Sequence, residues 1–372
     1  MPESNIVIVG GGAAGLTTAG ALKQIGLESV ILDKDDRVGG TWARRYERLH
    51  LHSVRAFSGL AHYPIPRRFP KYIPKDMFVQ YLQDYAGHFD LKFVGGCPVS
   101  KVRRRDGAWN VESAQGEWRC RVVVIATGHY GTPRLPDWLG AKDYPGRLTH
   151  SVEHKTGRDY KDQRVLVIGA GNSGSEIAAD LVEQGAAFVA SSIRTPPPVV
   201  PRDVLGTPVQ VFGIVMSPLP PKLADRIGRL IARAVMGNLS RYGIRPPAWQ
   251  PFSAHRIPII DVGFVKQLKR GRIHVRPNIS RFTPTGVVYE DGRAEDFDAV
   301  IAATGFESGL SQLIDAPGLI DQRGYPAYPS GRPTAHPGFY FMGYTESVRG
   351  HLFEANRDSR RLARLIADYL RQ

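Results

Sequence analysis

The feature that most constrains the fold of this chain is a glycine-rich turn that occurs twice, each time between an apolar run and a helical pattern. The first copy is NIVIVGGGAAG over residues 5–15, and the second is VLVIGAGNSG over residues 165–174. A strand, a tight glycine turn and a helix whose N-terminus can face a pyrophosphate make up the dinucleotide-binding fingerprint. A lone glycine-rich turn can be only a turn, but strand, glycines and helix together favour nucleotide binding. Two copies therefore predict two nucleotides and two domains.

The two copies differ at the end of their second strand. After the first copy, the run SVILD over residues 29–33 ends in Asp33, 18 positions after Gly15, where an acid can accept hydrogen bonds from an adenosine ribose. After the second copy, the corresponding run ends in SSIR over residues 191–194, so that a cation stands where the acid is expected.

Composition narrows the classes of function. The 372 residues are too many for one simple core, and 42% hydrophobic with 23% charged residues is an ordinary globular balance. The net charge of +14 comes from 49 basic and 35 acidic residues, but the basic residues are scattered and form no RNA-binding or zinc-finger pattern. We therefore expect anionic small ligands and no nucleic acid. Cys97 and Cys120 provide no disulfide framework, and no apolar run approaches the roughly 20 residues that span a bilayer, so we expect a cytoplasmic protein.

Hydrophobic periodicity and turn residues predict several further elements. Residues 75–88 predict a helix that begins near Pro74, and residues 97–125 predict short strands around a turn at 106–107. Residues 195–220 are rich in proline and lack periodicity, so we predict a loop there.

Residues 222–236, KLADRIGRLIARAVM, predict an amphipathic helix. Its apolar stripe comprises Leu223, Ile227, Leu230, Ile231 and Val235, and its basic residues away from that stripe are Arg226, Arg229 and Arg233. A basic amphipathic helix can lie on a membrane surface, whereas soluble enzymes more commonly use such a helix as a cap over the active site. We expect a cap rather than membrane contact.

Three more strands are predicted to end in turns of small residues. VVVIATG over 122–128 and AVIAATG over 299–305 each close with Ala-Thr-Gly, which lets the backbone pass close to a cofactor or another segment. GFYFMG over 338–343 predicts a strand that runs into a glycine turn at Gly343.

This ordered set of motifs resembles the flavin-containing monooxygenases over nearly the whole chain. The resemblance rests on the glycine turn at 10–15, VGGTW at 38–42, the glycine turn at 169–174, and YPGRLTH at 144–150, which is similar to the family's identifying motif. Within the family the chain looks closest to the YUCCA-type branch, whose plant members oxidatively decarboxylate indole-3-pyruvate. That closer likeness rests on HSVEHK at 150–155, GNSG at 171–174, PRD at 201–203 and IPIIDVG at 257–263.

The chain departs from the family pattern at two places. The identifying motif should end in Phe, Tyr or Trp four positions after its histidine, but this chain has His154, which leaves the oxygenation class open. His52 stands where many members place an asparagine near the reactive flavin; it is our candidate catalytic residue, the alternative being a polar residue packed under the flavin. His50 and His52 lie two apart, but without a third ligand at suitable spacing we expect no metal site.

The resemblance implies FAD in the first unit and NADPH in the second. It also accounts for the terminal arginine, because a carboxylate at that strand end would repel the 2′-phosphate of NADPH, whereas Arg194 can bind it bidentately. The alternative is a solvated surface arginine. The predicted FAD-binding residues are Gly10, Gly12, Ala13, Ala14, Gly15, Asp33, Lys34, Gly40, Thr41, Trp42, Ala126, Thr127, Gly128 and Gly343. The predicted NADPH-binding residues are Gly169, Gly171, Asn172, Ser173, Gly174, Ser191, Arg194, Ala303, Thr304 and Gly305.

The predicted fold is therefore α/β, with two dinucleotide-binding, Rossmann-like domains. The FAD-binding domain is discontinuous, over 1–147 and 297–372, and the NADPH-binding domain is inserted over 148–296. The inserted domain carries a proline-rich loop and a helical cap around 195–260.

The implied activity is the transfer of one oxygen atom from O₂ to a small organic substrate through a C4a-(hydro)peroxyflavin, with NADPH as the reductant. Oxidative decarboxylation of a 2-oxo acid is the preferred reaction, and N- or S-oxygenation and Baeyer–Villiger oxygenation are alternatives. A flavin reductase that does not oxygenate is a second class, weakened for the disulfide-reductase kind because the chain has no Cys-x-x-Cys pair. A non-catalytic nucleotide sensor is a third. The sequence gives no indication of the oligomeric state.

Overall fold

The structure is a computed structural model that describes residues 4–372, and it divides into two compact units. Unit 1 comprises the residues up to Arg44, Ser53–Thr132 and Phe306–Gln372, and unit 2 comprises Arg45–His52 and Pro133–Gly305. Both units combine parallel sheets with helices, so the predicted α/β class is confirmed. The sheet of unit 2 continues to Ala302, past the predicted domain limit at residue 296.

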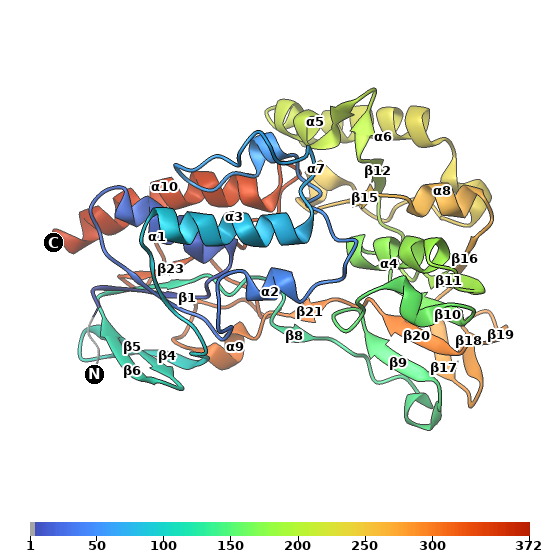
Figure 1. Ribbon diagram of the computed structural model, residues 1–372, viewed down its shortest axis with the longest axis horizontal. Coiled ribbons are helices and arrows are strands. Elements are labelled where there is room, and N and C mark those ends of the chain that lie inside the picture. Colours follow the sequence, from blue (N-terminus) through green and yellow to red (C-terminus); the bar gives the residue numbers. More distant parts are fainter. Residues whose placement is uncertain (1–3) are drawn as a thin grey trace. The chain divides into compact units, whose positions relative to one another are not determined.

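The central sheet of unit 1 has the strand order β23-β7-β1-β2-β3, and Figure 1 labels β1 and β23 of this sheet. Its parallel strands are β1 (Ile6–Val9), β2 (Val30–Leu32), β3 (Lys92–Val94), β7 (Val122–Ile125) and β23 (Phe339–Phe341). The strands β1, β7 and β23 are buried along their whole length, which is why they are short, continuous apolar runs.

Helices and an antiparallel layer complete unit 1. The helices are α1 (Ala13–Lys23), α2 (Gly40–Ala43), α3 (Lys75–His88), α9 (Leu310–Leu313) and α10 (His351–Leu370), with the 3₁₀ turn η1 (Arg55–Phe57). The layer consists of the antiparallel strands β4 (Val99–Arg105), β5 (Ala108–Ser113) and β6 (Gly116–Cys120), with the short β22 (Ile314–Asp315) paired in parallel to β4. The predicted helix after Pro74 and the predicted strands around 106–107 are thus confirmed. Helix α10 packs along α1, and the hydroxyls of Thr17 and Ser359 lie 3.3 Å apart between them.

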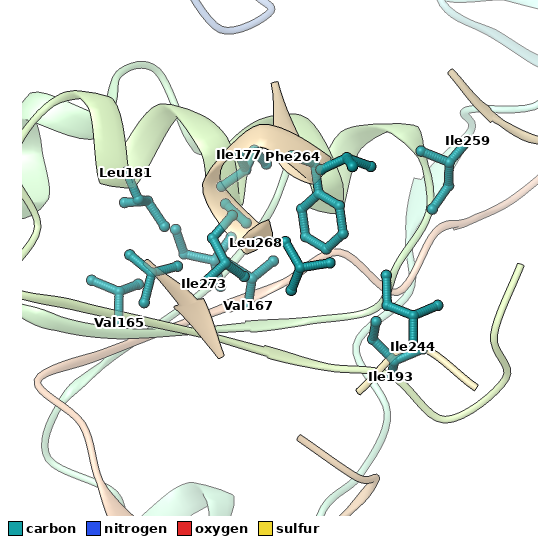
Figure 2. Packing of buried hydrophobic residues seen from close by; sticks show 14 of the residues in the cluster. Val165, Val167, Ile177, Leu181, Ile193, Ile244, Ile259, Phe264, Leu268 and Ile273 are labelled. Atoms are coloured by element: carbon teal, nitrogen blue, oxygen red, sulfur yellow. The ribbon is translucent and has the colours of Figure 1, made fainter. Parts of the chain in front are cut away.

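The central sheet of unit 2 has the strand order β16-β11-β10-β20-β9. Its parallel strands are β9 (Arg147–His150), β10 (Arg164–Ile168), β11 (Phe188–Ser192), β16 (Ile273–Arg276) and β20 (Ala299–Ala302). Helices α4 (Asn172–Glu183) and α8 (Phe264–Lys269) cover it, and Figure 2 shows Phe264 and Ile177 from these helices packed with Val165 and Val167 of β10. The unit also has an antiparallel layer made of β17 (Ile279–Phe282), β18 (Gly286–Tyr289) and β19 (Ala294–Asp296).

The segment 195–260 of unit 2 holds more regular structure than its sequence predicts. It contains β12 (Val199–Pro201), β13 (Asp203–Val204), β14 (Thr207–Pro208), α5 (Val209–Met216), α6 (Pro221–Met236), α7 (Pro251–Ala254) and the start of β15 (Ile259–Asp261). The prediction of a loop over 195–220 is wrong at α5. There Pro208 caps the N-terminus, and the residues VQVFGIVM form the helix. Proline is well tolerated at a helix start, so the prolines that suggested a loop bound a helix here. The predicted helix over 222–236 is confirmed as α6.

The remaining elements are short. They are η2 (Ala141–Asp143), η3 (Gly157–Tyr160), η4 (Leu239–Tyr242), β8 (Thr132–Pro133) and β21 (Phe306–Glu307). Within residues 4–372, no helix is both long enough and apolar enough to cross a membrane.

Candidate functional site

The first glycine turn joins β1 to α1 and leaves open space at one glycine only. Gly10 has φ +105°, and a Cβ there would lie 2.6 Å from the carbonyl oxygen of Ala126. A Cβ on Gly15 would lie 1.9 Å from the carbonyl oxygen of Gly10, so both glycines are required by the packing of the chain itself. At Gly12, by contrast, an added Cβ meets nothing within 4 Å among residues 4–372. This turn therefore fits a pyrophosphate, which would approach the backbone at Gly12 and the N-terminus of α1.

The second glycine turn joins β10 to α4 with nearly the same geometry. Gly169 has φ +103°, and a Cβ there would lie 2.4 Å from the carbonyl oxygen of Ala303. A Cβ on Gly174 would lie 2.1 Å from the carbonyl oxygen of Gly169, whereas one on Gly171 meets nothing within 4 Å in the described part of the chain. The second turn fits a pyrophosphate in the same way, at Gly171 and the N-terminus of α4.

Two neighbouring predicted residues of this turn have different surroundings. The Asn172 side chain is engaged by the chain itself: its Nδ2 donates to the carbonyl of Pro258 at 3.1 Å, and its Oδ1 accepts from the backbone N–H of Ile260 at 2.8 Å. Ser173 is exposed at the first turn of α4. Asn172 therefore holds the turn against the start of β15, and the Ser173 side chain lies beside the Tyr46 hydroxyl, to which it is hydrogen-bonded.

Asp33 lies directly after β2 and holds the first glycine turn. Its carboxylate accepts hydrogen bonds from the backbone N–H groups of Gly11 and Asp35, the latter at 2.7 Å. Burial raises the pKa of Asp33 above its ordinary value, and these two hydrogen bonds oppose the rise. Lys34, the next predicted residue, is exposed. The position of Asp33 at the strand end, beside the turn, fits an acceptor for a ribose hydroxyl.

The predicted residues 40–42 surround a carboxylate that the sequence analysis missed. Asp35 accepts from Thr41 Oγ1 at 3.0 Å and from the Arg44 guanidinium at 2.6 Å. A Cβ on Gly40 would lie 2.7 Å from the same carboxylate. The Trp42 ring makes an edge contact with an aromatic ring of α3. These residues therefore fix the start of α2, and Asp35 is its anchor.

The Ala-Thr-Gly turns lie beside the glycine turns. In unit 1, the hydroxyls of Thr127 and Tyr344 lie 2.8 Å apart, and a Cβ on Gly343 would lie 2.6 Å from Ala14 Cβ. Because Ala126 lies against Gly10, predicted FAD residues from three distant segments meet at the start of α1. Gly128 has φ +76°, which favours glycine.

In unit 2 the same arrangement recurs. Ala303 lies against both Gly169 and Gly174. Thr304 donates its hydroxyl to the carbonyl of Arg134, and the carbonyl of Gly305 lies 3.0 Å from His150 Nε2. The predicted NADPH residues of β20 and of the second glycine turn are therefore brought together.

The end of β11 carries two cations. Arg194 is exposed, and its carbonyl accepts a hydrogen bond from the guanidinium of Arg245 at 3.1 Å. Ser191 is buried within β11, only 1% exposed, so its side chain packs inside the unit. Arg245 was missed because it lies 51 positions away in the sequence and no motif marks it.

His52 belongs to a buried hydrogen-bonded cluster with Tyr46 and Glu176. Its Nε2 contacts one oxygen of the Glu176 carboxylate, and the Tyr46 hydroxyl donates to the other at 2.8 Å. Glu176 lies on α4 and is only 2% exposed. Burial, and then the charge of Glu176, raises the pKa of Tyr46 well above its ordinary value, so the hydroxyl remains a donor. Glu176 was not predicted from the sequence, because only the helical pattern marks its position in α4.

This cluster borders a cavity of about 290 Å³ within unit 2. The lining residues are Arg48, His50, His52, Glu176, Asp180, Glu183, Gln184, Arg202 and Val262. Two of the acids are already paired: Glu183 accepts from Arg48 at 2.8 Å, and Asp180 lies 3.0 Å from His154 Nε2. The lining thus carries three carboxylates, each with a partner, together with two histidines and two arginines.

His154, the departure from the identifying motif, is paired inside the core. It is 1% exposed, its Nε2 faces Asp180, and its ring stacks near Tyr160 with centroids 5.8 Å apart. The Asp180 carboxylate also accepts from the backbone N–H of Gly157 at 2.7 Å. His154 therefore fills a buried position with a polar ring, and Asp180 is its hydrogen-bond partner. His150, four positions earlier, has its pKa lowered mainly by burial, so it is neutral near pH 7.

Within residues 4–372, no group of three or more His, Cys, Asp or Glu side chains is arranged to hold a metal ion. His50 instead uses its Nδ1 in a 2.7 Å contact with the carbonyl of Arg48.

Comparison with known sequences identifies relatives over nearly the whole chain. The profile of the pyridine nucleotide-disulphide oxidoreductase family matches residues 7–197. The chain is 33% identical over 381 residues to the probable indole-3-pyruvate monooxygenase YUCCA3 of Arabidopsis thaliana, covering 97% of this chain and 86% of that protein. It is 35% identical over 353 residues to the indole-3-pyruvate monooxygenase YUCCA1 of Oryza sativa subsp. japonica, covering 91% and 86%.

Solved structures agree with this relationship. A flavin-containing monooxygenase from Stenotrophomonas maltophilia superposes with a TM-score of 0.76 at 25% identity, covering 100% of both chains. An oxidized steroid monooxygenase bound to NADP superposes with a TM-score of 0.77 over 98% of this chain and 85% of that one. At 20% identity the latter likeness concerns the fold alone.

Proposed function

We propose that this chain, which belongs to the flavin-containing monooxygenase family, oxidatively decarboxylates a 2-oxo acid. It is an FAD- and NADPH-dependent monooxygenase that uses O₂ and a small-molecule substrate. The overall reaction converts the 2-oxo acid, O₂, NADPH and a proton into a carboxylic acid one carbon shorter, CO₂, NADP⁺ and water. One oxygen atom of O₂ enters the new carboxyl group, and the other leaves as water.

The observation that carries this proposal is the sequence relationship to proteins named as indole-3-pyruvate monooxygenases, at 33–35% identity over more than nine tenths of this chain. The candidate catalytic residue His52 borders a cavity of about 290 Å³ that can hold a small substrate.

The two glycine turns are proposed to hold the cofactors. Gly12 and the start of α1 would hold the pyrophosphate of FAD, and Asp33 would accept hydrogen bonds from its ribose. Gly171 and the start of α4 would hold the pyrophosphate of NADPH, and Arg194 would bind its 2′-phosphate. Bound FAD supplies the two-electron and O₂ chemistry, with NADPH as its reductant.

His52 is proposed as the catalytic residue of the chain itself. Its Nε2 is occupied by Glu176, so Nδ1 is the nitrogen that would accept or return a proton at the substrate. The buried Glu176 carboxylate, with its second oxygen held by Tyr46, would fix the tautomer and the ring orientation.

Labelled oxygen tests the proposal directly. The purified holoenzyme is supplied with NADPH, ¹⁸O₂ and indole-3-pyruvate, with a sulfide and a tertiary amine offered separately. We expect one ¹⁸O atom in the carboxylic acid, with CO₂ and NADP⁺ formed in equal amounts. Label confined to the sulfoxide or the N-oxide would refute the 2-oxo acid proposal and leave the monooxygenase activity intact. NADPH consumption that yields only H₂O₂ with all three substrates would also refute it.

We also propose that the protein acts in the cytoplasm. Its two cysteines are free and buried, and burial raises the pKa of Cys120 to about 12, so this thiol is a poor nucleophile and a poor redox partner. The same fact counts against a reductase that works through a thiol pair.

A further inference from the structure

Helix α6 packs into unit 2 with part of its apolar surface only, and its Leu223, Leu230 and Val235 side chains are exposed. Ala224 and Met236 are buried, and Ala232 packs against the core cluster drawn in Figure 2. Asp225 is also buried, and its carboxylate accepts two backbone N–H groups of α7 at 2.9 and 3.0 Å. The only acid of α6 is therefore used inside the unit.

Six large apolar side chains of this region are exposed. Those that are exposed on α6, on α5, on the connection between them and at the β13–β14 turn are Leu205, Val215, Leu219, Leu223, Leu230 and Val235. Leu223 and Leu230 are seven positions apart, so they lie on one face of α6, and they are 46% and 63% exposed. Contiguous exposed apolar side chains with a polar rim mark interaction sites on soluble proteins.

Cations flank this apolar face. Lys222, Arg226, Arg229 and Arg233 are all exposed, and within residues 4–372 none of the four has an ion-pair partner. At 100° per residue these side chains project within a sector of about 60°, next to the sector of the leucines. An ordinary solvated helix would intersperse acids with these cations, but the exposed surface of α6 carries only positive charge.

We propose that α6 and the exposed apolar side chains around it form a peripheral docking surface for an anionic phospholipid bilayer. The leucines would enter the boundary between headgroups and acyl chains, and the four cations would contact the anionic headgroups. An anionic bilayer supplies both an apolar phase and negative charge, and it matches both halves of the surface. The net charge of +14 adds attraction at longer range.

The positive charge also favours an anionic bilayer over a second copy of the chain or a nucleic acid as the partner of this surface. A second copy of the chain docked on the same face would bring four more unpaired cations against the first four, which is repulsive. A nucleic acid would neutralise the cations but leave the leucines in water. Since no helix in the described part of the chain can span a bilayer, the contact is interfacial.

Vesicle flotation tests the proposal with the full-length holoenzyme. Two preparations are compared, phosphatidylcholine alone and phosphatidylcholine with about a third phosphatidylserine. We expect binding to the anionic vesicles only. Replacing Arg226, Arg229 and Arg233 together by Gln should lower the partition coefficient roughly a hundredfold. Each cation near the membrane surface raises that coefficient by a factor of somewhat less than about ten. Leu230→Asp should lower it roughly tenfold.

Matched variants make the result specific to α6. Arg241, Arg270 and Arg272 are exposed arginines elsewhere in unit 2, and replacing all three by Gln removes the same net charge. Leu139, 73% exposed, is the corresponding apolar control when changed to Asp. Neither control should affect vesicle binding beyond a few-fold, and all variants should retain flavin and NADPH oxidation in buffer without vesicles.

Three outcomes would overturn the proposal. The first is absence of binding to either vesicle preparation by the wild-type protein. The second is equal loss of binding with both triple-Gln variants, since that would assign the attraction to bulk charge. The third is concentration-dependent self-association that Leu230→Asp abolishes, since the surface would then be an interface between copies of the chain.

Discussion

The two nucleotide units are built on nearly the same glycine turn, but they differ in the residue that stands at the end of the second strand. In both turns the first and third glycines are enforced by the chain's own backbone, with an added Cβ 1.9 Å from a carbonyl oxygen at Gly15 and 2.1 Å at Gly174. In unit 1 the strand β2 leads to Asp33, whose carboxylate holds the turn. In unit 2 the strand β11 leads to the exposed Arg194, with Arg245 beside it. The backbone of both turns thus fits a dinucleotide, and we propose that the residue at the strand end determines which one binds.

The largest effect is expected from the third glycine of each turn. Gly15→Val and Gly174→Val would each force a side chain onto a carbonyl oxygen, lowering the free energy of unfolding by more than about 3 kcal/mol. The first should abolish FAD binding, and the second should abolish NADPH binding while flavin is retained. Thermal unfolding and flavin absorbance measure both effects.

Gly12→Ala and Gly171→Ala are the matched controls for those glycines. Their added Cβ meets nothing within 4 Å among the described residues, so the free energy of unfolding should change by no more than about 1 kcal/mol. Nucleotide binding should still weaken, because the backbone can no longer approach the pyrophosphate as closely. Full nucleotide affinity in either alanine variant would contradict the cofactor assignment for that unit.

The next effect is a loss of folding stability at acid pH, which we expect from His129 of unit 1. Burial, and then the neighbouring His351, lowers the pKa of His129 from 6.5 to about 4. Between these values the unfolded chain binds a proton that the folded chain does not, so the stability contributed by neutral His129 is complete above pH 6.5 and is lost as the pH falls to about 4. The loss should reach up to about 3 kcal/mol. Denaturant unfolding at pH 7 and pH 4.5 measures it, and His129→Gln should reduce the difference between the two pH values; an unchanged difference would assign the acid sensitivity to other groups.

A smaller effect concerns the choice of reductant in unit 2. Arg194→Ala should raise the KM for NADPH roughly 30-fold, corresponding to about 2 kcal/mol for a charged hydrogen-bonded pair, and leave the KM for NADH nearly unchanged. Arg270→Ala, at another exposed arginine of unit 2, is the control. Equal losses with NADPH and NADH would show that Arg194 serves the structure of the unit.

The smallest effect concerns the acid of unit 1. Asp33→Asn keeps an oxygen acceptor but removes the charge, so FAD affinity should fall about tenfold. Equilibrium titration of the apoprotein with FAD measures it, and Asp36→Asn, three positions later and exposed, is the control. An unchanged FAD affinity would mean that Asp33 acts only on the Gly11 and Asp35 backbone.

Local patterns in the sequence predicted the elements whose signals are short-range. The two glycine turns, α3 and the strand meander each depend on residues a few positions apart, and each is found where it was predicted. The helix α5 was missed because β-branched residues and flanking prolines are typical of loops and strands, although Pro208 here precedes a first helical turn. The solvent exposure of the α6 stripe was not predicted either, because periodicity groups side chains on a face without saying which face is covered.

Long-range partners were beyond the sequence patterns. Glu176 meets Tyr46 across 130 positions and His52 across 124, and no local motif links them. The pairing of His154 was not predicted either, since its partner Asp180 lies 26 positions later in the chain, on α4. Such pairs depend on which helices and strands pack together in the folded chain. The local patterns of a single sequence do not reveal that packing.

The placement of β23 and α10 has a consequence for how the chain is made. Unit 1 needs both of them, since β23 pairs with β7 and α10 packs along α1, whereas unit 2 has all its segments once Gly305 is present. On the ribosome, the inserted unit can therefore fold first, while β7 waits with one edge open throughout the synthesis of unit 2. An exposed, fully apolar strand edge is a template for aggregation, and a pause in translation after Gly305 would leave the edge of β7 unpaired for longer.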